Sequence, residues 1–174
     1  MIHDLDIVLH LVGEAKLEEI RAAGISILSQ KVDIGNVRLQ FSGGCVANLT
    51  ASRISTERVR KLRFFQPREY ISVDYGRQDV LQIRVTQEEK FSLSHLMEFA
   101  ESPSAFPIPG VALNKPKVAA EEPLRAELTS FLDSVRRRTK PVVPLEDGRR
   151  ALAAALKILS TIEEHSRRTK LSSL

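Results

Sequence analysis

Residues 32–52, VDIGNVRLQFSGGCVANLTAS, decide the fold class. Up to Phe41, apolar residues alternate with polar ones, and the apolar side holds Val37, Leu39 and Phe41. The sequence Ser42-Gly43-Gly44 then favours a turn. Beyond it, small apolar residues alternate with hydroxyl and amide residues: Ala47, Leu49 and Ala51 against Asn48, Thr50 and Ser52. Alternation on both sides of a turn predicts a β-hairpin with one small-apolar face and one hydroxyl/amide face.

Further alternating segments extend this hairpin into a larger sheet. Residues 22–28 form a candidate strand before it, and two more segments flank a turn at residues 76–79. Their apolar residues are Ile71, Val73 and Tyr75 before that turn and Leu81, Ile83 and Val85 after it. The Gly35-Asn36 step shifts the apolar phase between Ile34 and Val37, which predicts a β-bulge. Strands joined by short turns predict a mainly antiparallel sheet of about five or six strands.

Helical patterns lie toward both ends of the chain. Residues 2–12 carry apolar side chains over most of a helical wheel, so we expect a largely buried helix that stops at Gly13. Residues 91–101 favour a short helix, and the Pro-rich residues 102–110 an irregular loop. Two clear helices follow, one from Pro123 and one over about 146–167. Their apolar stripes are Leu124, Leu128, Phe131, Leu132 and Val135 in the first, and Leu152, Ala155, Leu156, Leu159 and Ile162 in the second.

The order helix, sheet, helices predicts an α+β domain over residues 1–174: an open, mostly antiparallel sheet with helices on one face. The length of 174 residues, 43% hydrophobic and 28% charged, suits one globular domain. Cys45 is the only cysteine, which excludes an internal disulfide and a thiolate metal site. We therefore expect an inert thiol in a reducing cytoplasm. We expect neither a membrane span nor a signal peptide.

His3, Asp6 and His10 form a narrow polar stripe on the first helix. Spacings of three and four residues put them on one edge, where burial is costly unless they have partners. Three interpretations stay open: a metal face, a catalytic imidazole at His3 tuned by a carboxylate, and a purely structural edge. A metal helix needs further ligands, and nothing else in the chain clusters His or Cys.

A basic run follows the hairpin, and its members are Arg53, Arg58, Arg60, Lys61 and Arg63. Arg53 comes directly after the hydroxyl-rich strand, where a guanidinium could grip a phosphate with two hydrogen bonds. The other cations fit a solvated strand edge, which basic side chains protect from aggregation. The net charge of +4 is compatible with a nucleic-acid-binding surface but is too small to indicate one. We do not expect nucleic acid as the partner.

Three segments together resemble a known enzyme family. Residues 1–13, MIHDLDIVLHLVG, resemble the His-Asp-x-Asp helix that begins the C-terminal domain of glucose–fructose oxidoreductase/inositol dehydrogenase-type enzymes. Residues 122–158 resemble their closing helices, with a Glu-Pro-Leu start and a Glu-Asp-Gly-x-Arg-Ala-Leu entry to the last helix. Residues 32–75 resemble a narrower group, the bacterial members that oxidise the 3-hydroxyl of UDP-N-acetylglucosamine for lipid A synthesis.

The resemblance implies roles for some residues of this chain, and it identifies family features for which this chain has no counterpart. It makes His3 the proton-transfer residue at the sugar hydroxyl, and Asp6 its partner or a substrate contact. In the family, NAD is bound by a separate N-terminal Rossmann domain, which also carries a catalytic lysine in a Glu-Lys-Pro motif. This chain has no such motif, and Gly43-Gly44 lies in a hairpin turn rather than a dinucleotide fingerprint. The family's aspartate four residues before the histidine would fall before Met1.

The resemblance therefore implies the C-terminal substrate and oligomerisation domain of an NAD-dependent sugar-nucleotide dehydrogenase. We expect that this chain alone neither binds NAD nor turns over, that it binds a sugar nucleotide through residues including Asp6 and Arg53, and that it forms a homo-oligomer through a sheet face. The alternative is a free-standing, non-enzymatic module that binds a sugar nucleotide or a partner protein.

Overall fold

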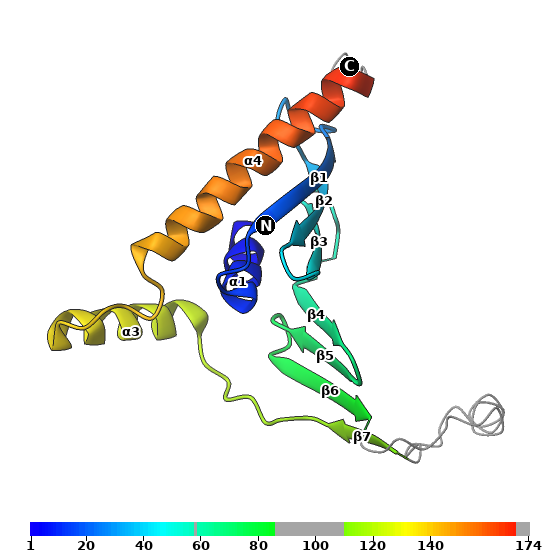
Figure 1. Ribbon diagram of the computed structural model, residues 1–174. Coiled ribbons are helices and arrows are strands. Elements are labelled where there is room, and N and C mark those ends of the chain that lie inside the picture. Colours follow the sequence, from blue (N-terminus) through cyan, green and yellow to red (C-terminus); the bar gives the residue numbers. More distant parts are fainter. Residues whose placement is uncertain (58, 86–109, 170–174) are drawn as a thin grey trace. The chain divides into compact units, whose positions relative to one another are not determined.

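The computed structural model describes residues 1–57, 59–85 and 110–169 (Figure 1). Contacts divide the chain into two compact units, one formed by residues 1–56 with residues 124–174 and one by residues 57–123. The helix predicted over residues 91–101 and nearly all of the loop predicted over 102–110 lie outside the described residues.

The first unit contains an antiparallel three-stranded sheet. Its strands are β1 (Leu17–Ile25), β2 (Ile34–Phe41) and β3 (Val46–Ser52), in the order β1-β2-β3. The hairpin predicted from residues 32–52 is confirmed, with Val37 opposite Leu49 and Arg38 opposite Asn48. One face is buried and apolar, whereas the other carries polar pairs such as Thr50 donating to the Asn36 side chain at 2.9 Å.

The bulge predicted at Gly35-Asn36 is wrong. Residues 34–40 pair in regular register with β3, and the register shift lies on β1 between Leu17 and Glu19. Gly35, Val37 and Leu39 all point to the buried face, so the inward alternation continues through Gly35. Ile34 belongs to the other face, and the apparent phase shift came from counting it as inward.

Two helices cover the apolar face of this sheet. They are α1 (Ile2–Val12) and α4 (Leu145–Thr169), and α4 packs against both β1 and α1. The shared core consists of Leu5, Val8 and Leu9 from α1, Ala151, Ala154, Ile158 and Ile162 from α4, and Val37, Leu39, Phe41 and Leu49 from the sheet. Helix α1 is less buried than its sequence predicts, since Ile2 and Leu11 are 44% and 54% exposed.

The stripe predicted for α4 is only partly the core-facing one. Ile162 packs inward as expected, but Leu152, Leu156 and Leu159 are about half exposed. The core-facing residues of α4 are Ala151, Ala154, Ile158 and Ile162, and Ile162 lies against the cross-strand pair Gly24 and Gly35. A methyl group built on Gly24 would lie 2.9 Å from Cγ2 of Ile162. The third helix, α3 (Pro123–Arg137), begins at the predicted proline and exposes its whole apolar stripe.

The second unit is a separate antiparallel sheet. Its strands β4 (Lys61–Gln66), β5 (Glu69–Asp74), β6 (Asp79–Val85) and β7 (Val111–Asn114) lie in chain order. The turns between them use left-handed backbone at Arg68 and Gln78. The α+β class, with open antiparallel strands, is confirmed; in the described part of the chain these strands form two sheets rather than the one that was predicted. Strands β4 and β7 were missed because β4 is embedded in a basic run and β7 is short.

Candidate functional site

The polar stripe of α1 lies along the edge of the core. Leu5, Val8 and Leu9 turn the apolar side of the helix inward, and this leaves His3 and His10 exposed and Asp6 half-buried. Helix α1 is capped by Gly13, whose positive φ of 61° glycine adopts without the strain that a side chain would cause. The predicted site residues His3 and Asp6 thus stand on one accessible helix edge.

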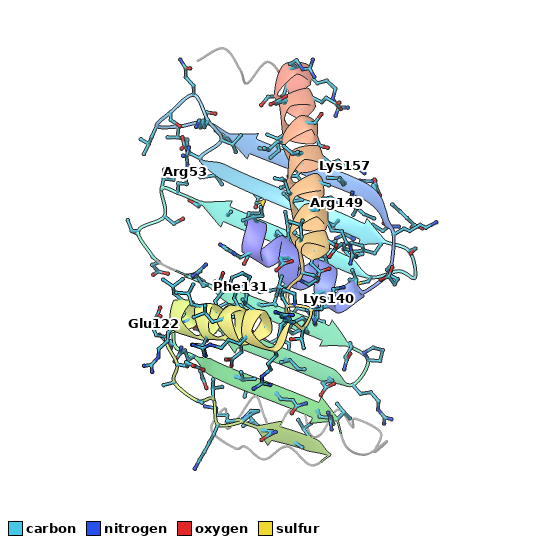
Figure 2. All side chains as sticks on the ribbon, turned by 90° about the vertical axis from the view of Figure 1, so that its left-hand side faces the viewer. Arg53, Glu122, Phe131, Lys140, Arg149 and Lys157 are labelled. Carbon is cyan, nitrogen blue, oxygen red and sulfur yellow. The ribbon has the colours of Figure 1, made fainter. Side chains whose placement is uncertain are left out.

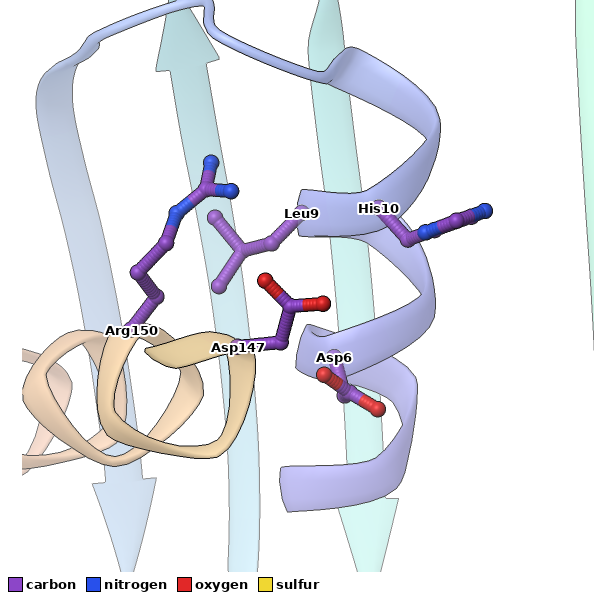
Figure 3. Close-up of a pocket in the computed structure, with 5 residues that line it drawn as sticks. All are labelled: Asp6, Leu9, His10, Asp147 and Arg150. Carbon is purple, nitrogen blue, oxygen red and sulfur yellow. The ribbon is translucent and has the colours of Figure 1, made fainter. Parts of the chain in front are cut away.

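The start of α4 brings two further charged residues to that edge. Asp6 and His10 line a small cleft with Asp147, Arg150 and Leu9 (Figure 3). The cleft holds about 10 Å³, which is room for roughly one water molecule. This polar group therefore has space for solvent but not for a sugar in the present arrangement.

Arg150 fixes the end of α1 to α4. Its Nη2 donates a hydrogen bond of 2.7 Å to the backbone carbonyl of Gly13, one of the carbonyls that a helix end leaves without an intrahelical donor. A cation near a helix C-terminus also favours the helix dipole. Arg150 therefore holds the polar stripe of α1 in a fixed position beside Asp147.

Arg53 is partly committed to a structural contact. Its Nη2 lies 2.6 Å from Oδ1 of the buried Asp33 and donates to the hydroxyl of Ser29 at 3.0 Å. The Asp33 carboxylate also accepts backbone N–H bonds from Ile27 and Leu28 at 2.7 and 2.8 Å. These backbone donors, more than Arg53, lower the pKa of Asp33 from 3.8 to about 2. The Arg53 side chain remains 55% exposed, so part of its guanidinium faces solvent.

Arg53 lies toward the same end of the sheet as the start of α1. It follows Ser52, which pairs with Ile34. Met1 lies against the next residue of that strand, because a methyl group built on Gly35 would be 3.6 Å from its Cε. Met1 and Arg53 thus lie toward one end of the first unit, although no hydrogen bond or ion pair described for Arg53 reaches α1.

The basic run does not form one patch within a unit. Arg53 belongs to the first unit, whereas Arg60, Lys61 and Arg63 belong to the second. Lys61 forms an ion pair of 3.3 Å with Asp74 across β4 and β5. The pKa of Asp74 is lowered by the backbone N–H of Arg77 and by Lys61. Lys61 thus lies on β4, the first strand in the order of this sheet, and pairs with a carboxylate of the neighbouring strand.

A second polar cluster crosses the β4–β7 sheet at Glu69. Arg84 forms an ion pair of 2.7 Å with its carboxylate, which also accepts hydrogen bonds from Gln66 and Gln82. Asn114 continues the row by donating to Gln82 at 3.2 Å. The hydrogen bond from Arg84, then that from Gln82, lowers the pKa of Glu69. The cluster joins all four strands and satisfies its own charge, so we interpret it as structural.

Other kinds of site were sought in the described part of the chain. Residues 1–57, 59–85 and 110–169 hold no group of three or more His, Cys, Asp or Glu side chains placed to bind a metal ion. Within the same ranges, no helix has the length and apolar character needed to cross a membrane. Cys45 is exposed.

Comparison with known proteins supports the family resemblance, although no family model matches the sequence. The chain is 32% identical over 164 residues to the UDP-N-acetylglucosamine 3-dehydrogenase of Acidithiobacillus ferrooxidans. The match takes in 94% of this chain and 47% of that enzyme, so the chain spans about half the length of this curated relative. A solved structure of the same enzyme superimposes with a TM-score of 0.77 at 30% identity, covering 94% of this chain and 47% of that one.

More distant structures share the fold. The aldose–aldose oxidoreductase of Caulobacter crescentus matches with a TM-score of 0.67 at 18% identity, covering 94% of this chain and 44% of its own. The WlbA dehydrogenase of Bordetella pertussis, solved with NADH and UDP-GlcNAcA, matches with a TM-score of 0.51 at 12% identity and 41% of its own length. The predicted resemblance is confirmed as a relationship to the C-terminal half of the Acidithiobacillus dehydrogenase, and the more distant structures share the fold.

The sequence predicted His3, Asp6 and Arg53 but missed Asp147 and Arg150. Both lie in the Glu-Asp-Gly-x-Arg-Ala-Leu segment, which was noted as the entry to a helix. That signal could have identified them, but their position beside Asp6 depends on how α4 packs on α1, which only the structure gives.

Proposed function

We propose, from its relationship to the C-terminal half of sugar-nucleotide dehydrogenases, that this chain is the substrate side of an NAD-dependent enzyme that oxidises the 3-hydroxyl of UDP-N-acetylglucosamine. The observation that carries the proposal is the 32% identity to such a dehydrogenase over 94% of the chain. The exposure of His3 on a helix anchored by Arg150 supports it, since a proton-transfer group needs access to substrate and a fixed position.

His3 is the proposed base. Oxidation of a secondary alcohol removes a hydride from carbon and a proton from oxygen, leaving a ketone. When bound, NAD supplies the hydride acceptor, and the imidazole of His3 takes the hydroxyl proton. Asp6, on the same edge of α1, is proposed to contact the sugar or to orient His3.

Arg53 is proposed to contact the phosphates of the nucleotide. Its contact with Asp33 holds the side chain in place, and its 55% exposure leaves donors for a phosphate. A guanidinium already held by a carboxylate loses less conformational entropy when it binds a phosphate than an unrestrained guanidinium does. The proposal therefore gives Arg53 two tasks, one toward Asp33 and one toward substrate.

A chimera tests the proposal. In it, residues 1–174 replace the matched half of the Acidithiobacillus dehydrogenase. We expect the chimera to reduce NAD when UDP-N-acetylglucosamine is added, and residues 1–174 alone to leave NAD unchanged. A chimera that binds NADH but does not oxidise the sugar would contradict the proposed function. It would favour the alternative of a non-enzymatic module, which binding of the sugar nucleotide by residues 1–174 would then test.

We also propose a homo-oligomer formed through the β4–β7 sheet. The β1–β3 sheet has one apolar face, which α1 and α4 cover, and one polar face. The β4–β7 sheet carries apolar side chains on both faces. Register puts Leu62 and Val73 on one and places Phe65, Tyr70, Ile83 and Leu113 together on the other. An apolar sheet face favours a partner.

Light scattering tests this arrangement. We expect residues 1–174 to form a dimer or tetramer at micromolar concentration, and Phe65→Glu to shift it toward the monomer, because Phe65 is 77% exposed. Lys157→Gln, at an exposed position of α4 in the first unit and with the same change of one charge as Phe65→Glu, is the control. A wild-type monomer would contradict the proposed oligomer.

A further inference from the structure

Asp33 is a buried carboxylate at the end of the β1–β2 loop, which we define as residues 26–33. It is 4% exposed, and a carboxylate removed from water is costly unless hydrogen bonds compensate it. Its backbone forms two hydrogen bonds of 2.9 Å, one to the carbonyl of Ile25 and one from the N–H of Arg53. Asp33 therefore joins the end of β1 to the residue that follows β3.

The two carboxylate oxygens of Asp33 have different partners. Oδ2 accepts the backbone N–H groups of Ile27, Leu28 and Ser29 at 2.7, 2.8 and 3.2 Å. Oδ1 accepts a bond of 2.6 Å from Nη2 of Arg53 and one of 3.4 Å from the Ser29 hydroxyl. One oxygen thus orders the loop, and the other orders the arginine.

Arg53 is held in place without using all its donors. It follows the last residue of β3, at one end of the sheet (Figure 2). A guanidinium carries five N–H donors, and the bonds to Asp33 and to the Ser29 hydroxyl both start from Nη2. Nε and Nη1 form no hydrogen bond with the residues that the structure describes, and the side chain is 55% exposed. The donors of these two nitrogens are thus left for a ligand.

Asp33 does not depend on Arg53 for its charge. The backbone N–H groups of Ile27 and Leu28 are the main causes that lower the pKa of Asp33, ahead of Arg53. The carboxylate is therefore stabilised by its own loop. An anion that binds the other donors of Arg53 leaves this stabilisation intact.

We propose that Asp33 is a positioning residue for the nucleotide end of the substrate site, and that it acts through Arg53. It fixes the guanidinium to the ordered β1–β2 loop, so that the remaining donors meet the diphosphate. This rests on the proposed function, which gives Arg53 the phosphate contact, and it adds the residue and the loop that set its position. A side chain ordered before binding loses less conformational entropy when the ligand arrives. Asp33 itself touches no ligand, because its carboxylate is buried.

Asp33→Asn separates the two tasks of the carboxylate. Asparagine has one oxygen and one NH2 group in place of two oxygens. When its oxygen accepts the loop N–H groups, its NH2 group faces Nη2 of Arg53, donor against donor. The variant therefore keeps the loop and releases the arginine. Glu19→Gln is the matched control, since it also removes one negative charge and a carboxylate partner 2.6 Å from an arginine, Arg21, to which no ligand contact is assigned.

Calorimetric titration of the chimera with UDP measures the effect without turnover. Loss of a hydrogen bond to a charged group lowers affinity by roughly 10–100-fold, so Arg53→Gln should raise the dissociation constant of UDP by about tenfold or more. Asp33→Asn should raise it by about three- to tenfold, the effect of immobilising one long side chain on binding. Glu19→Gln should leave it unchanged within about twofold. The Asp33→Asn/Arg53→Gln double variant should bind UDP as Arg53→Gln does, because Asp33 acts only through Arg53.

Each other outcome overturns the proposal. An Asp33→Asn affinity equal to that of the parent chimera means that Arg53 is positioned by something else. Additive losses in the double variant mean that Asp33 acts on the fold rather than through Arg53, and an Asp33→Asn variant that does not fold means that one amide oxygen cannot serve the loop. A parent chimera that does not bind UDP, or an Arg53→Gln variant that binds it as the parent does, removes the ligand contact itself.

Turnover separates this proposal from the proposed function. In a chimera that oxidises UDP-N-acetylglucosamine, Asp33→Asn should raise KM and retain kcat, because Arg53 contacts the nucleotide and not the reacting hydroxyl. A loss of kcat at unchanged KM would contradict the positioning role. UDP binding that responds to Asp33→Asn in a chimera without turnover retains the positioning role and rejects the proposed activity.

Discussion

Replacing Gly24 by alanine should destabilise the first unit at the point where α4 approaches the sheet. The new methyl group would lie 2.7 Å from Cγ1 of Val32, 2.9 Å from Cγ2 of Ile162 and 3.2 Å from the backbone oxygen of Ile34. The side chains can shift, but the strand carbonyl is held by its ladder. Overpacking of this kind costs about 1–3 kcal/mol, and alanine returns roughly 0.5 kcal/mol by restricting the unfolded chain. We therefore expect a net loss of about 2 kcal/mol.

Urea unfolding followed by far-UV circular dichroism measures this loss, because the chain has no tryptophan and its helices report on the first unit. A typical urea dependence of about 2 kcal/mol per M converts the loss into a midpoint roughly 1 M lower. Gly148→Ala is the matched control, since nothing lies within 4 Å of its added methyl group. Because Gly148 lies within a helix, its replacement by alanine should raise the free energy of unfolding by about 0.5–1 kcal/mol.

A double-mutant cycle assigns the cost to the contact with α4. Ile162→Ala alone should cost about 2–5 kcal/mol as a core truncation. Because it removes the Cγ2 atom that Gly24→Ala meets, the double variant should lose about 1 kcal/mol less than the sum. Strict additivity, or a Gly24→Ala variant as stable as wild type, would refute the close approach of α4 to this strand.

Three further predictions concern the first unit. The folded pKa of Asp33 is about 2, below its unfolded value, so its contribution to stability is full above about pH 4 and is lost as the pH falls toward 2. The urea midpoint of Asp33→Asn should lack this acid-dependent loss. A variant whose midpoint falls with pH in the same way as that of the wild type would contradict the assignment to Asp33. Arg150→Ala removes the donor to the Gly13 carbonyl and should lower stability by about 1 kcal/mol, whereas unaltered unfolding would show the bond to be unimportant. Leu156→Ser should change stability by less than about 0.5 kcal/mol and Ile158→Ala should lower it by about 2–5 kcal/mol; similar losses would mean that the wrong flank of α4 was assigned to the core.

Local patterns predicted the elements well, for identifiable reasons. The β2–β3 hairpin follows from strict alternation around Gly43-Gly44, both glycines having positive φ. Helix α1 follows from its apolar wheel and from Gly13. In each case the signal lies within about a dozen residues, and burial of one face sets the register.

What the sequence missed depends on contacts between distant residues. The core-facing side of α4 could not be chosen from its helical wheel, because both sides are apolar and the leucines form the more hydrophobic one, whereas the structure packs Ala151, Ala154, Ile158 and Ile162 inward. The bond between Arg53 and Asp33 spans 20 residues and turns a candidate phosphate ligand into a partly structural group. Asp147 reaches the site only through the packing of α4 against α1.

The most direct test of the central claim is the turnover of the chimera with and without His3. The claim is that His3 on the exposed edge of α1 takes the proton from the sugar hydroxyl. Initial rates of NAD reduction with UDP-N-acetylglucosamine are compared for the chimera, its His3→Ala variant and its His10→Ala variant. General base catalysis is worth roughly 10²–10⁴-fold, so His3→Ala should lose at least a hundredfold in kcat while His10→Ala retains most of the rate. Equal rates for the His3→Ala variant and its parent would contradict the account.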